Sequence, residues 1–134
     1  MFLVILCLSC SKDNVKPSAD SMAASDAIHN LSVIKDAYEA KNEIILRSHA
    51  HSLLVDNIIK YFYFETAKLD FTPRLVRLTD TDVKVNLNWQ GTWTFENDKE
   101  VTRSGVGNLV FHKETMKLTK VEGDNPFLTP AMRN

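Results

Sequence analysis

The stretch Asp82–Phe95, DVKVNLNWQGTWTF, alternates between polar and apolar residues at every position. Its odd positions carry valine, leucine, tryptophan, glycine and phenylalanine, while its even positions carry aspartate, lysine, asparagine, glutamine and threonine. Because successive side chains of a β-strand point to opposite faces, the pattern predicts a strand with one apolar face. The alternation lasts for about thirteen residues, far longer than the usual strand of five or six.

A second long strand is predicted after this one. The run ENDKE (96–100) indicates a turn, and the next strand is expected over Val101–His112, with Phe95 opposite Val101. A register shift of two residues would keep the faces, whereas a shift of one would move the apolar set into water. We expect a bend or bulge in mid-hairpin, with a tryptophan covering bare backbone, because three glycines gather there: Gly91, Gly105 and Gly107.

Two shorter strands are predicted on either side of this hairpin. Leu75–Leu78 follows Pro73 and leads into the turn TDTD (79–82). A last strand is expected over Thr115–Val121, with Leu118 opposite Leu109 and Met116 opposite Phe111. Residues 123–134 contain two prolines and are predicted to form an irregular tail.

The region 18–72 contains neither glycine nor proline, which favours helices. Either Ser21 or Ser25 is expected to cap the first helix. The apolar residues of this helix recur about once per helical turn: Ile28, Leu31, Ile34, Tyr38 and Ile45.

The helical pattern loses its register after Ile45, which predicts a break within Arg47–Ser52. A second helix is expected from Leu54 to Phe62. A strand over IIKYFYF (58–64) is the alternative, because this run is rich in β-forming residues. The sequence therefore predicts an α+β domain over residues 22–122, with two N-terminal helices packed on a curved four-stranded antiparallel meander.

This order of elements, the WxGxWxF strand and the paired GxG together resemble the nuclear transport factor 2-like (cystatin-like cone) superfamily. In that superfamily a curled sheet wraps a long helix, so the resemblance implies a cone-like domain over about residues 22–122. Its enzymes use an interior Asp or His, and no residue of this chain matches such a motif. A plain two-layer α+β sandwich is the alternative.

The N-terminal stretch MFLVILCLSC ends an apolar run at Ser9 and Cys10. Phe2–Leu8 spans about 10 Å as a helix, too short for a bilayer core of about 30 Å, so it indicates an export signal. A buried first strand is the alternative. No Lys or Arg precedes the run, so either the true start lies upstream or the sequence is truncated.

The same stretch resembles the lipobox of bacterial lipoproteins. This resemblance implies a signal peptide over residues 1–9, cleavage before Cys10 and a diacylglycerol on its thiol. The following SKDN (11–14) resembles the export signals of Bacteroidetes surface lipoproteins. Residues 10–21 then form an acylated cysteine and a polar tether, and two acyl chains would give lasting attachment to the outer membrane or cell surface.

Composition excludes some classes of function. The 134 residues are 44% hydrophobic, enough for one domain with its own core. Sixteen Lys and Arg against seventeen Asp and Glu disfavour a nucleic-acid binder, which would be basic. The sequence HAH (49–51) diverges on a helix and lacks a third ligand, so neither a metal nor another cofactor is expected. No catalytic residue is predicted, because a nucleophile elbow is also missing.

Arg103 is the only charged residue on the predicted apolar face of the hairpin. A buried guanidinium without a partner is costly. One interpretation is therefore a ligand pocket that Arg103 closes against an anionic group, with Trp89, Trp93 and Tyr38 as walls. The other is that Arg103 stacks on Trp93 and reaches water near the end of the strand.

Three functional hypotheses follow. The first is a non-catalytic, membrane-tethered envelope lipoprotein that binds a protein partner or a small ligand. The second is a cone-fold isomerase or hydrolase with a cavity under Trp89 and Trp93, which a cavity filled by side chains would eliminate. The third is an interaction protein that uses the polar face of the sheet. A homodimer through the outer face of the sheet is expected by analogy with cone-like proteins.

Overall fold

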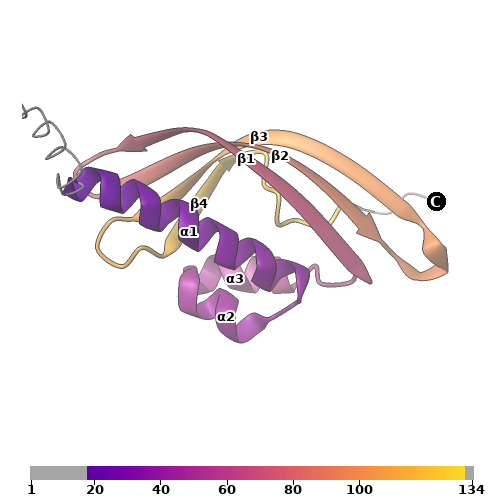
Figure 1. Cartoon of the computed structure of the whole chain (residues 1–134). Coiled ribbons are helices and arrows are strands. Elements are labelled where there is room, and N and C mark those ends of the chain that lie inside the picture. The colour runs from indigo at the N-terminus through magenta and orange to yellow at the C-terminus, as the bar shows by residue number, and fades with distance from the viewer. Residues whose placement is uncertain (1–17, 132–134) are drawn as a thin grey trace, which may run out of the picture.

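The computed structural model describes residues 18–131. Within these residues, three α-helices precede four strands, and the helices are α1 (Ala19–Glu39), α2 (Glu43–His49) and α3 (Ser52–Ile59). All three helices lie on the concave side of a strongly curved sheet (Figure 1). The expectations for residues 1–17, including the export signal and the acylation of Cys10, lie outside the described residues.

The sheet is an antiparallel meander in the order β1-β2-β3-β4. Its strands are β1 (Thr66–Leu78), β2 (Asp82–Thr94), β3 (Glu100–His112) and β4 (Leu118–Gly123). The predicted α+β class and the four-stranded curved meander are confirmed, with three helices where two were expected.

The alternation along β2 is confirmed residue by residue, because its buried positions are the odd ones from Val83 to Trp93. Both tryptophans therefore lie on the same, concave face. The predicted pairing of β2 with β3 was wrong by two residues, because Trp93, and not Phe95, lies opposite Val101. Phe95 lies beyond the paired residues, and its N–H donates a hydrogen bond to the Lys99 carbonyl at 2.8 Å. The short 3₁₀ turn η2 (Glu96–Asp98) between these residues explains the shift, and an even shift keeps both faces.

The first strand is much longer than predicted and begins at Thr66, not at Leu75. Pro73 is accommodated because β1 is an edge strand, with a partner on one side only. The pairing with β2 shifts between Pro73 and Leu75, so Arg74 is the extra residue of a bulge. The bulge expected among the glycines is therefore found in β1, and β2 and β3 pair without interruption.

The last strand also starts later than predicted. Leu118 pairs with Phe111, and Val121 takes the place opposite Leu109. The difference comes from a second irregularity between Val110 and Phe111. Met116 lies in the preceding turn with a positive φ of 58° and does not pair with Phe111 as expected.

The helices differ from the prediction at their ends. The cap of α1 is Ser18, whose hydroxyl accepts a hydrogen bond from the Ser21 N–H at 3.0 Å. The expectation of a cap at Ser21 or Ser25 was therefore wrong. The first helix ends at Glu39, after which Lys41 takes a positive φ of 54° and Asn42 caps α2. The predicted break before Ser52 is present, at residues 50 and 51. The third helix ends at Ile59, so residues 61–64 are neither helix nor strand.

The glycines of the hairpin leave room for larger neighbours. A Cβ on Gly91 would lie 2.5 Å from the Trp93 ring, so that ring covers bare backbone as predicted. A Cβ on Gly105 would lie 2.6 Å from the side chain of Asp124, in the segment that follows β4. This segment then places Phe127 in the core with no exposed surface. Within residues 18–131, no helix is both long and apolar enough to cross a membrane.

Candidate functional site

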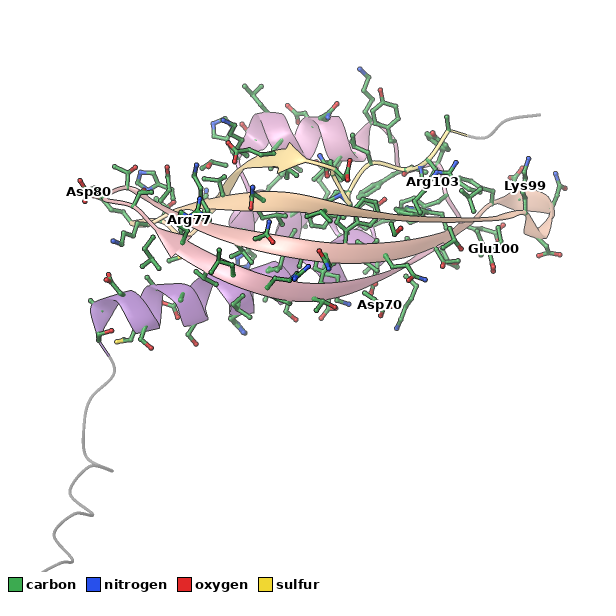
Figure 2. All side chains as sticks on the ribbon, turned by 90° about the horizontal axis from the view of Figure 1, so that it is seen from above. Asp70, Arg77, Asp80, Lys99, Glu100 and Arg103 are labelled. Carbon is green, nitrogen blue, oxygen red and sulfur yellow. The ribbon has the colours of Figure 1, made fainter. Side chains whose placement is uncertain are left out.

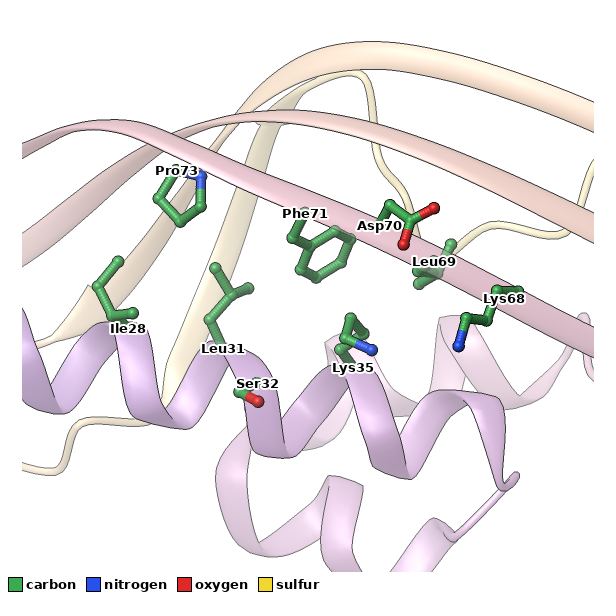
Figure 3. A pocket seen from close by; sticks show the side chains of 9 residues that line it. All are labelled: Ile28, Leu31, Ser32, Lys35, Lys68, Leu69, Asp70, Phe71 and Pro73. Carbon is green, nitrogen blue, oxygen red and sulfur yellow. The ribbon is translucent and has the colours of Figure 1, made fainter.

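A groove lies where α1 passes beneath the free edge of β1 (Figure 3). Its volume of about 320 Å³ is within the usual range for small-molecule sites, about 300–1,000 Å³. We call it the α1–β1 groove and define it by the nine residues that line it: Ile28, Leu31, Ser32, Lys35, Lys68, Leu69, Asp70, Phe71 and Pro73.

The walls of the groove follow from the periods of the two elements. Residues spaced by three, four and seven positions share one face of a helix, which brings Ile28, Leu31 and Lys35 to the side of α1 that faces β1. On β1, Leu69 and Phe71 point toward the concave side. Leu31 and Leu69 are buried and form an apolar floor.

A carboxylate joins the two walls beside the groove. The Leu69 N–H at the free edge of β1 donates a hydrogen bond to Glu39 Oε2 at 2.6 Å. The same carboxylate lies 3.5 Å from Lys35 Nζ, which is also 3.3 Å from Asp36 Oδ1. Glu39 thus satisfies an edge donor that would otherwise have no partner in the sheet, and it fixes the end of α1 to β1.

Two ammonium groups enter the groove from opposite walls. Figure 3 shows the side chains of Lys35 and Lys68 in the space between α1 and β1, and the Asp70 carboxylate lies beside the β1 ribbon among the groups that line the groove. Lys35 has the two carboxylate partners given above. Lys68 has neither an ion pair nor a side-chain hydrogen bond within residues 18–131.

The interior under the tryptophans is filled. Trp93 Nε1 donates a hydrogen bond to the Tyr38 hydroxyl at 2.8 Å, and both side chains are 0% exposed. Three phenylalanine rings surround the Tyr38 ring at centroid distances of 5.3–5.8 Å: Phe62, Phe64 and Phe127. Burial raises the pKa of Tyr38 above its ordinary value. A side chain with no accessible surface touches no water-sized void. Tyr38 and Trp93 therefore do not form the wall of an open pocket.

The predicted pocket residues therefore have different environments. Trp89 is 8% exposed and donates through Nε1 to the Asp124 carbonyl at 3.0 Å. Arg103 is exposed on β3 opposite Gly91, and its Nη1 donates to the Thr102 carbonyl at 3.0 Å. In Figure 2 it lies toward the end of the sheet that carries Lys99 and Glu100. Its side chain is therefore exposed, and the stacking on Trp93 that the second interpretation included is not found within residues 18–131.

The histidine pair has structural roles at the break between two helices. His49 ends α2, Ala50 forms a bridge with Leu118, and His51 caps α3 by accepting from the Leu53 N–H at 3.3 Å. Within the described residues, no three His, Cys, Asp or Glu side chains gather in a way that could hold a metal ion.

Sequence reasoning missed the α1–β1 groove. Its α1 wall was predicted as helix, but its β1 wall falls in residues 66–74, which were not predicted as strand. A signal was present, because TAKLDFT (66–72) alternates as β2 does. Pro73 obscured it, since proline usually marks the end of such a pattern.

The architecture has a counterpart among solved structures. A protein of the nuclear transport factor 2 (NTF2-like) superfamily from Salmonella enterica subsp. enterica serovar Typhimurium str. LT2 superposes with a TM-score of 0.70. The match covers 80% of this chain and 93% of that chain, at 11% sequence identity. The fold is NTF2-like.

The evidence for the NTF2-like fold is structural. No protein-family model matches the sequence, and no curated protein matches it at a significant level. The comparison confirms the fold that the sequence resemblance implied, a curled sheet around a long helix. An NTF2-like fold serves both ligand-binding proteins and enzymes, so the fold by itself does not determine the function.

Proposed function

We propose that this chain is a lipid-anchored protein of the bacterial envelope, whose NTF2-like domain binds a small ligand in the α1–β1 groove without catalysing a reaction. The α1–β1 groove is the observation that supports ligand binding. It offers an apolar floor with polar groups at its rim, which is the usual composition of a small-molecule site.

The filled interior supports binding over catalysis. A cone-fold enzyme of this chain would need an open cavity under Trp89 and Trp93, and the Tyr38, Phe64 and Phe127 side chains take up that space. A second argument comes from the groove itself. Its lining contains Lys35, Lys68 and Asp70 but neither histidine nor cysteine.

Substitution of Ser32 tests the binding site. Ser32 is exposed on the α1 wall, so Ser32→Trp would fill the groove, and Ser25→Trp places the same side chain on an exposed position of α1 outside the groove. We expect small apolar compounds to shift the amide resonances of groove residues in the wild type and in Ser25→Trp, but not in Ser32→Trp. Equal binding by both variants, or turnover of a bound compound, would contradict the proposal.

The anchor is tested separately. Cells fed with labelled palmitate should incorporate the label into the wild type, and the protein should sediment with membranes. Cys10→Ala should abolish both signals, whereas Cys7→Ala should leave acylation at Cys10 intact. A wild-type chain that mass spectrometry finds without a lipid would refute this part of the proposal and leave the groove untouched.

A further inference from the structure

The α1–β1 groove is chemically polarised along its length. α1 and β1 run in opposite directions here, so Ile28 lies near Pro73 at one end, while Lys35 and Lys68 lie toward the other (Figure 3). Ile28 and Lys35 are seven positions apart, which is about 10 Å along the helix axis. The groove is thus apolar at one end and cationic at the other.

We propose that the groove takes an amphipathic anion, an aliphatic carboxylate whose head group contacts Lys68 and whose tail lies toward Ile28 and Pro73. This inference rests on the proposed function and names the ligand class of the same site. An unbranched tail can lie along the groove, and its burial against the partly exposed Ile28 and Phe71 supplies the apolar part of the binding free energy.

The head group is assigned to Lys68 by the charges around it. Two nearby carboxylates are already used, because Glu39 accepts from the Leu69 N–H and pairs with Lys35, and Asp36 also pairs with Lys35. The third, Asp70, lines the groove and makes no ion pair with Lys68. Lys68 is therefore the cation of the groove that no carboxylate pairs with within residues 18–131. A carboxylate ligand would give its ammonium a charge-assisted hydrogen bond.

The volume sets the size of the ligand. A water molecule takes about 30 Å³ of liquid, so a groove of about 320 Å³ has room for about ten non-hydrogen atoms. An eight-carbon carboxylate has that number of atoms. Octanoate is therefore the probe, with 1-octanol as the neutral comparison and octylammonium as the cationic one.

The test measures binding of the three probes to the full chain in detergent, followed by amide resonance shifts of groove residues. Partitioning of a probe into micelles affects all variants alike. We expect octanoate to bind more tightly than 1-octanol or octylammonium, and added salt to reduce that preference. Lys68→Met should weaken octanoate binding about fivefold, the order expected of one partly exposed ion pair, and leave 1-octanol binding unchanged.

Lys117→Met is the matched control, because it removes the same charge from an exposed lysine outside the groove. Octanoate binding by this variant should equal that of the wild type. Equal affinity for octanoate and 1-octanol, tighter binding of octylammonium, or an equal effect of both lysine substitutions would overturn the ligand class and leave groove binding standing. Failure of all three probes to shift groove resonances would overturn the proposed function as well.

Discussion

The hydrogen bond from Trp93 Nε1 to the Tyr38 hydroxyl is buried, so its loss should be measurable in the stability of the fold. Tyr38→Phe keeps the ring and its contacts with the surrounding phenylalanines but removes the acceptor. The Trp93 N–H then stays buried without a partner, which costs about 1–3 kcal/mol. The Thr129 hydroxyl, 3.4 Å from the Tyr38 oxygen, still donates to the Tyr61 carbonyl and adds little to the loss. We expect the free energy of unfolding to fall by about 2 kcal/mol.

Urea denaturation followed by far-ultraviolet circular dichroism measures this change, and equal slopes would show that the unfolded states are comparable. Trp93→Phe and the double variant complete a cycle, from which we expect a coupling free energy of about 1 kcal/mol. Tyr63→Phe is the control, since Tyr63 is exposed, and it should change stability by less than about 0.5 kcal/mol. A Tyr38→Phe protein as stable as the wild type, or a coupling of zero, would refute the role of this bond.

Three further predictions concern the same core. Burial raises the pKa of Tyr38 in the folded state, so the stability that the neutral phenol contributes is complete below pH about 10 and is lost as the pH rises through the folded pKa. Urea midpoints should therefore fall above pH 10, and they should fall less steeply in Tyr38→Phe. Gly91→Ala places a methyl group 2.5 Å from the Trp93 ring and 2.8 Å from Leu69, and should lower the free energy of unfolding by about 1–3 kcal/mol; an unchanged urea midpoint would contradict this. Phe127→Ala removes a fully buried ring and should cost about 3–5 kcal/mol by calorimetry, where a loss below about 1 kcal/mol would show that the segment after β4 is not part of the core.

The hairpin was predictable because its information is local. Alternation from Val83 to Trp93 sets the faces of β2 without knowledge of the rest of the chain, and the burial of each residue agrees with it. The pairing register was not local in this sense. It depends on the turn at Glu96–Asp98, where Asn97 and Asp98 take positive φ values of 72° and 58° that the residue types alone did not settle.

The position of Arg103 shows a limit of the same reasoning. The alternation along β3 correctly indicates which face of the strand a residue occupies, but it does not indicate whether other side chains cover that face. The hairpin of β2 and β3 extends beyond the helices in Figure 1, so Arg103, which is on the apolar face but near the tip of the hairpin, is exposed to solvent. The α1–β1 groove was out of reach for a related reason, because it depends on how a helix crosses a strand edge.

The passage of the chain across β3 after β4 has a consequence for the order of events during synthesis. Gly105 and Gly107 leave space for Asp124, which bonds through its backbone and its carboxylate to Val106 and leads Phe127 to its place beside Tyr38. Every earlier element can emerge from the ribosome while this space stays vacant. The last cooperative step therefore waits for residues that are translated after the whole sheet, and a chain still in transit remains incompletely packed and open to chaperones.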